Sequence, residues 1–306
     1  MNKQQIQWKL NRLARQVQER LDSFQNLWRG AQSKTRMCPN CRALIGVSEK
    51  DCPMCGVRLR RRPSGIGKLL QNVLPNYAPV SLVLVTINFV VFLLIFAAER
   101  DLSSGDLRRL VWGVSSTSLA RWGADVALLV YQGQWWRLVS AVFVHIGIIH
   151  LLFNTYALLF IGPLLEEGLR KERFLVIYIF SGVFGFLLSN WYYDPRLTTA
   201  GASGAIFGLI GAALVLSKRW SSWGSLVHQQ LVHWAIYGFV YGLFIGNTAA
   251  HFGGLVAGAA VAFLIPSPNR GESSRAGEAA WSVLYWGCLA LVGLSLFLAV
   301  QFRLSL

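Results

Sequence analysis

Hydrophobic residues dominate the chain from about residue 80 onward, in runs that approach the length of a lipid bilayer. A helix that crosses the hydrocarbon needs about 20 predominantly apolar residues. Seven stretches come close to that length: residues 80–98, 146–165, 174–193, 201–217, 231–246, 249–265 and 281–300. The pattern predicts an all-α polytopic membrane protein.

Residues 1–36 have a different pattern. From Ile6 to Leu27, hydrophobic residues recur every three or four positions and basic residues lie between them. This spacing predicts a basic amphipathic helix. Such a helix could form a short coiled-coil seam, pack on its own domain or lie on the membrane surface, and the sequence leaves these alternatives open.

The formal net charge of +15 is concentrated before the first apolar run. Residues 1–79 hold 15 Lys and Arg against 4 Asp and Glu, which gives +11 of the +15. A basic segment beside the first membrane span is explained by retention in the cytoplasm and by attraction to anionic membrane lipids. We therefore expect no nucleic-acid partner, and residues 63–79 are interpreted as a basic linker.

Two cysteine pairs lie between the amphipathic helix and this linker. The pairs, each separated by two residues, are Cys38 with Cys41 and Cys52 with Cys55. Four thiolates suit the tetrahedral coordination of structural zinc. We expect a zinc ribbon over residues 37–62, a structural Zn²⁺ and an unknown cytoplasmic partner; the alternative is four free thiols. The ribbon should lie in a reducing cytoplasm.

The basic residues of the loops predict the orientation of the chain. With the N-terminus inside, basic residues near 170–173 and 218–219 and in the expected loop 266–280 lie on the cytoplasmic side. The sequence then predicts a multi-pass protein of the cell membrane with seven spans. The C-terminus would lie outside.

In this topology, polar residues from three spans lie near the outer membrane face. Ser203 begins the fourth apolar run and His251 begins the sixth, while His150 and Asn154 lie on one face of the second. Serine among glycines is also common where membrane helices pack closely. Ionisable residues in membrane spans, however, are costly and indicate function.

Glycines predict close packing between the fourth and sixth runs. They form a stripe in the fourth run and a GxxxG in the sixth, at Gly201, Gly204, Gly208, Gly211, Gly254 and Gly258. Helices that meet through glycine would bring Ser203 to His251, which could then act as its base.

The sequence favours a catalytic dyad over a triad. No Asp or Glu occurs from Pro195 to Gly271, although a carboxylate from the loop at 99–140 is an open alternative. His150, Asn154 and the backbone N–H of Ser203 are the available donors for an oxyanion.

Several motifs resemble the rhomboid intramembrane serine proteases, in the order that this family has them over about residues 75–265. They are Gly133-Gln134-Trp135-Trp136-Arg137, Phe143-Val144-His145, His150-Leu151-Leu152-Phe153-Asn154, Gly201-Ala202-Ser203-Gly204 and Ala250-His251-Phe252-Gly253-Gly254. The resemblance implies a six-helix core at 80–265, which cleaves other transmembrane proteins near the outer membrane interface, with a seventh helix and tail at 281–306 beyond it.

The same resemblance implies roles for individual residues. Ser203 would be the nucleophile and His251 the base, while His150 and Asn154 would help to stabilise the oxyanion. Trp136 and Arg137 would belong to a structural motif. Phe207 stands where many relatives have Tyr; its ring can stack on His251 but cannot donate a hydrogen bond.

The leading hypothesis is an intramembrane serine endopeptidase that needs no cofactor for catalysis, with transmembrane proteins as substrates and membrane lipids as its surroundings. One alternative is a catalytically silent relative that binds membrane clients and controls their trafficking or degradation. Another is a transporter or channel, which usually has charged or broken helices at the midplane. The predicted spans hold no such charges.

Overall fold

The chain divides into two compact units, residues 1–76 and residues 77–306. The computed structural model describes residues 35–37, 44–46, 51–56, 78–99, 111, 113–219, 224–265 and 275–305. The expected amphipathic helix, Cys38, Cys41 and the basic linker before residue 78 lie outside the described residues.

The first unit contains a short hairpin and a turn. Strands β1 (Thr35–Met37) and β2 (Leu44–Gly46) pair in antiparallel fashion, with Arg36 opposite Ile45. Further along, the Gly56 N–H donates to the Cys52 carbonyl at 2.8 Å, and Gly56 has a φ of +70°. Glycine suits this left-handed conformation because it has no Cβ.

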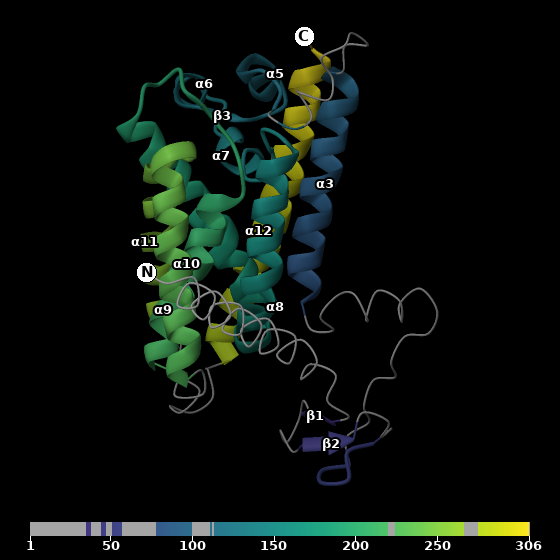
Figure 1. The fold of residues 1–306 in the computed structure, drawn as a ribbon. Coiled ribbons are helices and arrows are strands. Elements are labelled where there is room, and N and C mark those ends of the chain that lie inside the picture. Colours follow the sequence, from purple (N-terminus) through teal and green to yellow (C-terminus); the bar gives the residue numbers. More distant parts are fainter. Residues whose placement is uncertain are drawn as a thin grey trace, which may run out of the picture. The chain divides into compact units, whose positions relative to one another are not determined.

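The second unit is built from helices, drawn in Figure 1 from blue to yellow along the chain. The longer helices are α3 (Pro79–Glu99), α8 (Ile148–Tyr192), α9 (Ser203–Arg219), α10 (Gly224–Ile245), α11 (Thr248–Phe263) and α12 (Arg275–Leu304). A large cluster of buried apolar side chains joins α3, α8, α9 and α11. The helices share this core, which holds their ends in fixed relative positions.

A described helix covers most of each of the seven expected apolar stretches, and where it falls short it omits one or two residues at an end. Four segments are long and apolar enough to cross a membrane: Pro79–Ala98, Ile148–Glu166, Gly168–Tyr192 and Ala276–Leu304. α11 and residues 231–240 of α10 are apolar but shorter. The count of six helices plus one therefore stays a prediction. α12 also begins before the expected residue 281, with the charged Glu278 in its first turn.

α8 contains two of the expected spans, joined by a kink. Arg170 interrupts the helix with φ 69° and ψ 152°. Close to this kink, the buried Glu166 accepts hydrogen bonds from the backbone N–H groups of Val80, at 2.8 Å, and Ser81, at 3.0 Å. The first N–H groups of a helix have no partner within it. Glu166 therefore fixes the start of α3 against α8.

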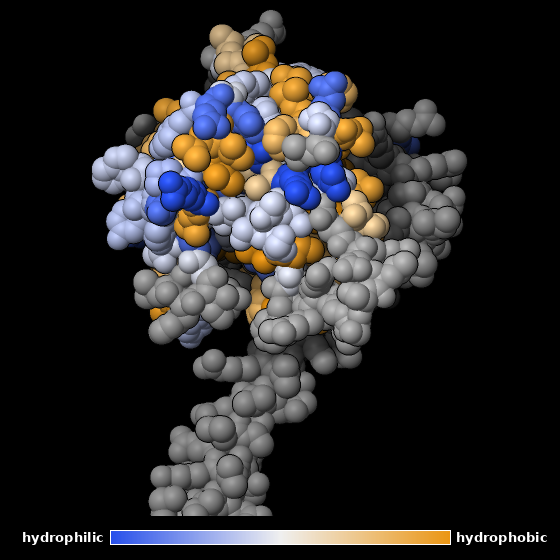
Figure 2. Space-filling view, turned by 90° about the horizontal axis from the view of Figure 1, so that it is seen from above, coloured by the Kyte–Doolittle hydropathy of each residue, from blue (hydrophilic) through white to orange (hydrophobic). Residues whose placement is uncertain are grey.

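The segment between α3 and α8, residues 113–147, is called the α3–α8 connection below. It holds three short helices and a strand: α5 (Ser116–Arg121), α6 (Ala127–Tyr131), α7 (Arg137–Ser140) and β3 (Asp125–Val126). These elements gather at one end of the helices (Figure 1). In the view onto that end, hydrophilic side chains are interspersed with hydrophobic ones (Figure 2).

α9 and α11 meet through the glycines that the sequence indicates. A Cβ at Gly254 would collide with the carbonyl oxygen of Gly204, and one at Gly258 with that of Gly208. The predicted close packing is therefore confirmed for these glycines. For Gly201 the prediction is wrong, because α9 begins only at Ser203 and Gly201 has a φ of +128° in the preceding loop.

Candidate active site

Ser203 and His251 are in contact across the α9–α11 packing. Ser203 is the first residue of α9, and His251 lies in the first turn of α11. The Ser203 Oγ atom is 2.9 Å from the His251 Nε2 atom. The sequence predicts this contact, and it has hydrogen-bond geometry. The catalytic roles of the two residues stay predictions.

The start of α11 and one ring face hold His251 in place. Asn247 caps the helix by accepting a hydrogen bond from the Ala250 N–H at 2.8 Å, and it donates to Ser189 Oγ at 2.5 Å. The Phe207 ring stacks on the imidazole at 4.4 Å between centroids and 15° between planes. Phe239 of α10 packs against the edge of Phe207 at 5.0 Å. The stacking expected for Phe207 is therefore present.

The remaining nitrogen of His251 bears on the choice between a dyad and a triad, which stays open because Asp101 and Asp106 lie outside the described residues. Its Nδ1 atom is buried and has no hydrogen-bond partner among the described residues. A triad would place a carboxylate there to orient the ring. The buried acid of the α3–α8 connection, Asp125, is instead hydrogen-bonded to Asn190 and Thr199.

His150 lies against the loop that leads into Ser203. A Cβ added at Gly201 would come within 2.5 Å of the His150 Cε1 atom and 2.8 Å of its Nε2 atom. The Gly201 N–H donates to the Ala141 carbonyl at 2.9 Å. Only glycine leaves room for the imidazole so close to the backbone and also tolerates the positive φ. Gly201 thus brings a second imidazole to the segment beside Ser203.

Asn154 is buried one helical turn after His150. Its Nδ2 atom donates to the His150 carbonyl at 2.9 Å. A side-chain amide has two N–H donors, so one hydrogen remains for another acceptor. This bond also fixes the direction in which the amide points.

A small network holds the loop before Ser203 to the α3–α8 connection. Strand β4 (Thr198–Thr199) pairs with β3, so that Asp125 lies opposite Thr199. The fully buried Asp125 accepts hydrogen bonds from Asn190 Nδ2 at 3.1 Å and Thr199 Oγ1 at 3.2 Å. Burial raises the pKa of this carboxyl to about 6. The two hydrogen bonds and the nearby Arg137 charge lower the pKa, but their combined effect is smaller than that of burial.

Arg137 organises the α3–α8 connection from within. It is fully buried, and its guanidinium donates to the carbonyls of Ala120 and Ala124 and to the side-chain oxygen of Gln134. Burial lowers the pKa of Arg137 to about 10, while the Asp125 charge raises it. The guanidinium is therefore still charged at neutral pH. These contacts agree with the structural role that the resemblance implies.

Sequence reasoning missed Asp125 and Glu166. Both are acids whose carboxylates bind groups far away in the sequence, at residues 190–199 and 80–81 respectively. One signal for Asp125 was available: it stands among the apolar residues Ala124, Val126 and Ala127, and an acid that is buried with such a run needs a partner.

The described residues do not test the zinc prediction. Among them, no group of three or more His, Cys, Asp or Glu side chains could hold a metal ion. Cys52 and Cys55 are described, but the other two expected ligands are not. The zinc site stays a prediction.

Comparison with known proteins bears on this site. A rhomboid domain model matches residues 132–268. The chain is 36% identical over 165 residues to "Rhomboid protease GluP" of Bacillus subtilis (strain 168), covering 53% of this chain and 32% of that protein. It is 33% identical over 162 residues to "Putative rhomboid protease YdcA" of the same organism, covering 51% of this chain and 81% of that protein. The chain belongs to the rhomboid family.

The rhomboid match contains Ser203, His251, His150 and Asn154, and ends before α12. A plant protein, "RHOMBOID-like protein 1" of Arabidopsis thaliana, is 34% identical over 159 residues, covering 50% of this chain and 40% of that protein. The chain thus spans well under two thirds of GluP and of this plant relative, but most of YdcA. Rhomboid membership and the apolar helices together make it a multi-pass membrane protein.

Proposed function

We propose that the protein is an intramembrane serine endopeptidase that cleaves transmembrane proteins near the outer membrane interface. The observation that carries the proposal is the contact between Ser203 and His251, at 2.9 Å, across helices that glycine brings together. Relatives named rhomboid proteases, GluP and YdcA, support the same reaction class.

In the first step, the Ser203 Oγ atom attacks the carbonyl carbon of the scissile peptide bond, and His251 Nε2 takes the hydroxyl proton. Serine is a weak nucleophile until a neighbouring base removes this proton. The protonated His251 then gives the proton to the leaving amine as the C–N bond breaks. One substrate fragment departs, and the other is bound to Ser203 as an ester.

The negative charge on the substrate oxygen needs hydrogen-bond donors. The Ser203 N–H is one, because it belongs to the start of α9 and has no partner within the helix. His150 and the second N–H of the Asn154 amide supply the others. The positive end of the α9 dipole favours an anion at the same place.

Water completes the reaction. His251 removes a proton from a water molecule, whose oxygen attacks the ester. As the bond between the acyl carbon and Ser203 Oγ breaks, His251 returns the proton to Oγ, and the second fragment leaves as a carboxylic acid. Ser203 is only partly buried, so a water molecule has a route to this step. The reaction uses the Ser203 and His251 side chains, the oxyanion donors and water, and we propose no cofactor for it.

A fluorophosphonate probe tests the proposal directly. The full-length protein, reconstituted in liposomes with a reporter transmembrane substrate, should release two fragments and should react with the probe at Ser203, mapped by mass spectrometry. Wild-type protein that binds the reporter without cleaving it, and does not react with the probe, would favour the silent-relative alternative. Since both Ser203 and His251 are present and in contact, we favour the enzyme.

We also propose that the chain lies in the cell membrane with its N-terminus in the cytoplasm and its C-terminus outside. The basic residues 1–79 support this orientation. Cysteine labelling of intact cells checks it: a single cysteine introduced after residue 304 should react with an impermeant maleimide, and one introduced near residue 2 should not.

For the first unit, we propose a structural Zn²⁺ bound by Cys38, Cys41, Cys52 and Cys55, in a domain that binds a cytoplasmic partner. The first pair lies in sequence between β1 and β2, and the second belongs to the turn that runs from Cys52 to Gly56. Cys38→Ser should reduce the zinc measured in the purified protein from about one ion per chain. Equal zinc in both proteins would contradict the site.

A further inference from the structure

α12 lies beyond the rhomboid match but contacts the α3–α8 connection at one end and the α8 kink at the other. We propose that α12 is a positioning element for the active site. It holds the α3–α8 connection in place and thereby fixes the backbone that leads into Ser203. This role rests on the proposed protease function and deepens it, because it assigns a task to a helix outside the matched domain.

The C-terminal end of α12 packs on the residues that organise the connection. Phe302 lies 5.9 Å from the Trp136 ring, measured between centroids, and the Arg137 guanidinium lies 4.9 Å above the Phe302 ring. The Arg303 guanidinium lies 5.9 Å from the Trp122 ring. These are one aromatic contact and two cation–π contacts, one of them from the buried Arg137, and they join the end of α12 to the connection.

A single stripe of α12 makes these contacts. Val292, Ser295 and Ala299 are the buried residues of the helix, and with Phe302 they follow one another at intervals of three or four positions. Such spacing places them on one face. A Cβ added at Gly123 would lie only 2.9 Å from the Ala299 Cβ atom. The absence of a side chain at Gly123 therefore lets α12 pack directly against the backbone of the connection. Phe297, by contrast, is 58% exposed.

Two hydrogen bonds link the contact between α12 and Gly123 to the backbone that precedes Ser203. Ser140 Oγ donates to the Gly123 carbonyl at 2.7 Å, which ties α7 to the residue that faces Ala299. The next residue, Ala141, accepts a hydrogen bond from the Gly201 N–H at 2.9 Å. Gly201 is two positions before Ser203. A shift of α7 would therefore move the backbone that presents the nucleophile and lies against His150.

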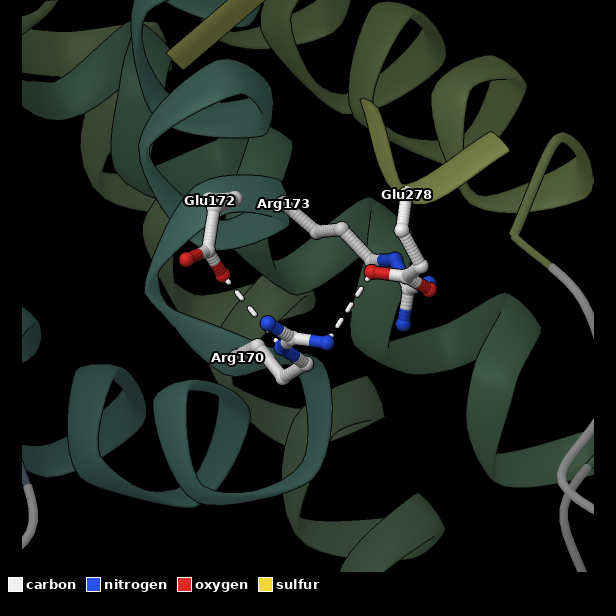
Figure 3. A network of polar contacts seen from close by, with 4 residues as sticks. All are labelled: Arg170, Glu172, Arg173 and Glu278. Atoms are coloured by element: carbon white, nitrogen blue, oxygen red, sulfur yellow. Dashed lines mark hydrogen bonds and ion pairs between the residues drawn. The ribbon is translucent and has the colours of Figure 1, made fainter. Parts of the chain in front are cut away.

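The N-terminal end of α12 is held by charge. Glu278 bonds at 3.0 Å to Arg170, the residue at the α8 kink, and also contacts Arg173, three residues later. Figure 3 shows both guanidinium groups directed toward this carboxylate, with Glu172 paired to Arg170 from the other side. α12 is thus fixed at both ends while most of its length is exposed. A helix fixed in this way resists sliding along its axis.

The main experiment removes the Phe302 ring in the full-length protein. Phe302→Ala should lower kcat about 10-fold with little change in KM, since a misplacement of about 1 Å away from the chemistry can cost up to ~10²-fold. Amide hydrogen exchange in residues 119–141 should become faster. Phe302→Tyr keeps the ring and should restore both values, whereas Phe297→Ala on the exposed face should match the wild type.

A different result would overturn the inference. If Phe302→Ala lowers only the melting temperature, with kcat of the folded protein and exchange in residues 119–141 both unchanged, α12 does not position the connection. If the wild type itself neither cleaves a reporter nor reacts with the fluorophosphonate probe, the proposed function fails. The hydrogen-exchange comparison of Phe302→Ala with Phe297→Ala still decides the role of α12 in that case.

A second pair of variants tests the charged end. Glu278→Gln should lower kcat by about twofold, a small effect because an exposed ion pair contributes little. Glu172→Gln, which removes the other acid at Arg170 but none on α12, is the matched control and should leave kcat unchanged. Equal effects of the two substitutions would contradict the anchoring of α12 by Glu278.

Discussion

α9 carries a serine–histidine contact at each of its two ends. At its start, Ser203 Oγ lies 2.9 Å from His251 Nε2. Near its end, Ser217 Oγ lies 2.7 Å from His228 Nδ1, on α10. The two distances are similar, so distance alone does not distinguish a candidate nucleophile from a structural pair.

The hydroxyl protons of the two serines go to different acceptors. Ser217 Oγ donates to the Leu214 carbonyl at 3.0 Å within its own helix. Because a hydroxyl has one proton, His228 then acts as the donor toward Ser217 and does not serve as its base. Among the described residues the Ser203 hydroxyl has no carbonyl acceptor of this kind, so its proton is available to the His251 Nε2 atom.

The ends of the helix also differ in their electrostatics. Ser203 begins α9, where free N–H groups and the helix dipole favour a negative charge. Ser217 is in the last turn, beside Lys218 and Arg219, where carbonyls are exposed. His150 lies beside the loop at the Ser203 end of α9, next to Gly201. What distinguishes the candidate site is thus its surroundings, and the predictions below test that difference.

The largest effect is expected from removing one hydroxyl at a time. Ser203→Ala should reduce kcat by on the order of 10⁴- to 10⁶-fold, as loss of a serine nucleophile does in a serine protease, and should end fluorophosphonate labelling. Ser217→Ala is the matched control, with activity within about twofold of the wild type. A loss of similar size in both variants, with both proteins folded, would remove the distinction between the two pairs.

Asn154 tests the surroundings of the first pair. Asn154→Ala should lower kcat by about 10²- to 10³-fold, the cost of losing one oxyanion donor, with a smaller change in KM. Steady-state cleavage of a reporter substrate measures both parameters. An unchanged kcat would remove the Asn154 amide from the set of donors.

Gly258 tests the packing that brings the first pair together. A methyl group there collides with the Gly208 carbonyl, whereas one at Gly293 of α12 meets nothing within 4 Å. We expect Gly258→Ala to lower the free energy of unfolding by about 1–3 kcal/mol. Gly293→Ala should be neutral or stabilising by up to about 1 kcal/mol. Thermal unfolding in detergent compares them, and equal melting temperatures would contradict tight packing of α9 on α11.

Asp125 tests the loop before Ser203 through pH. Its folded-state pKa, about 6, is above the value of 3.8 for a free side chain. The folded state therefore binds the proton more tightly, so this contribution to stability is fully present below about pH 4 and is lost as the pH rises through about 6. Melting temperatures of the wild type should fall from pH 5 to pH 7 more steeply than those of Asp125→Asn. Parallel curves would contradict the raised pKa.

Much of the architecture could be predicted from local pattern. The apolar runs located the helices, because the length of a membrane span and the periodicity of a helix are properties of contiguous sequence. The glycine spacing indicated the packing of α9 on α11, and with it the contact between Ser203 and His251. Gly201 was wrongly assigned to the packing face of α9. The pattern of small residues at helical spacing extends to Gly201, but the helix begins only at Ser203.

Sequence by itself thus determined the helical segments, the glycine faces and the polar residues that could meet. Only the tertiary structure decided that Ser217 bonds to a carbonyl of its own helix while Ser203 contacts His251, that Asp125 holds Thr199, and that α12 reaches Trp136 and Arg137. The physical reason is that periodicity reports which face of one element is buried. Contacts between residues tens to well over a hundred positions apart depend on how several elements pack at once.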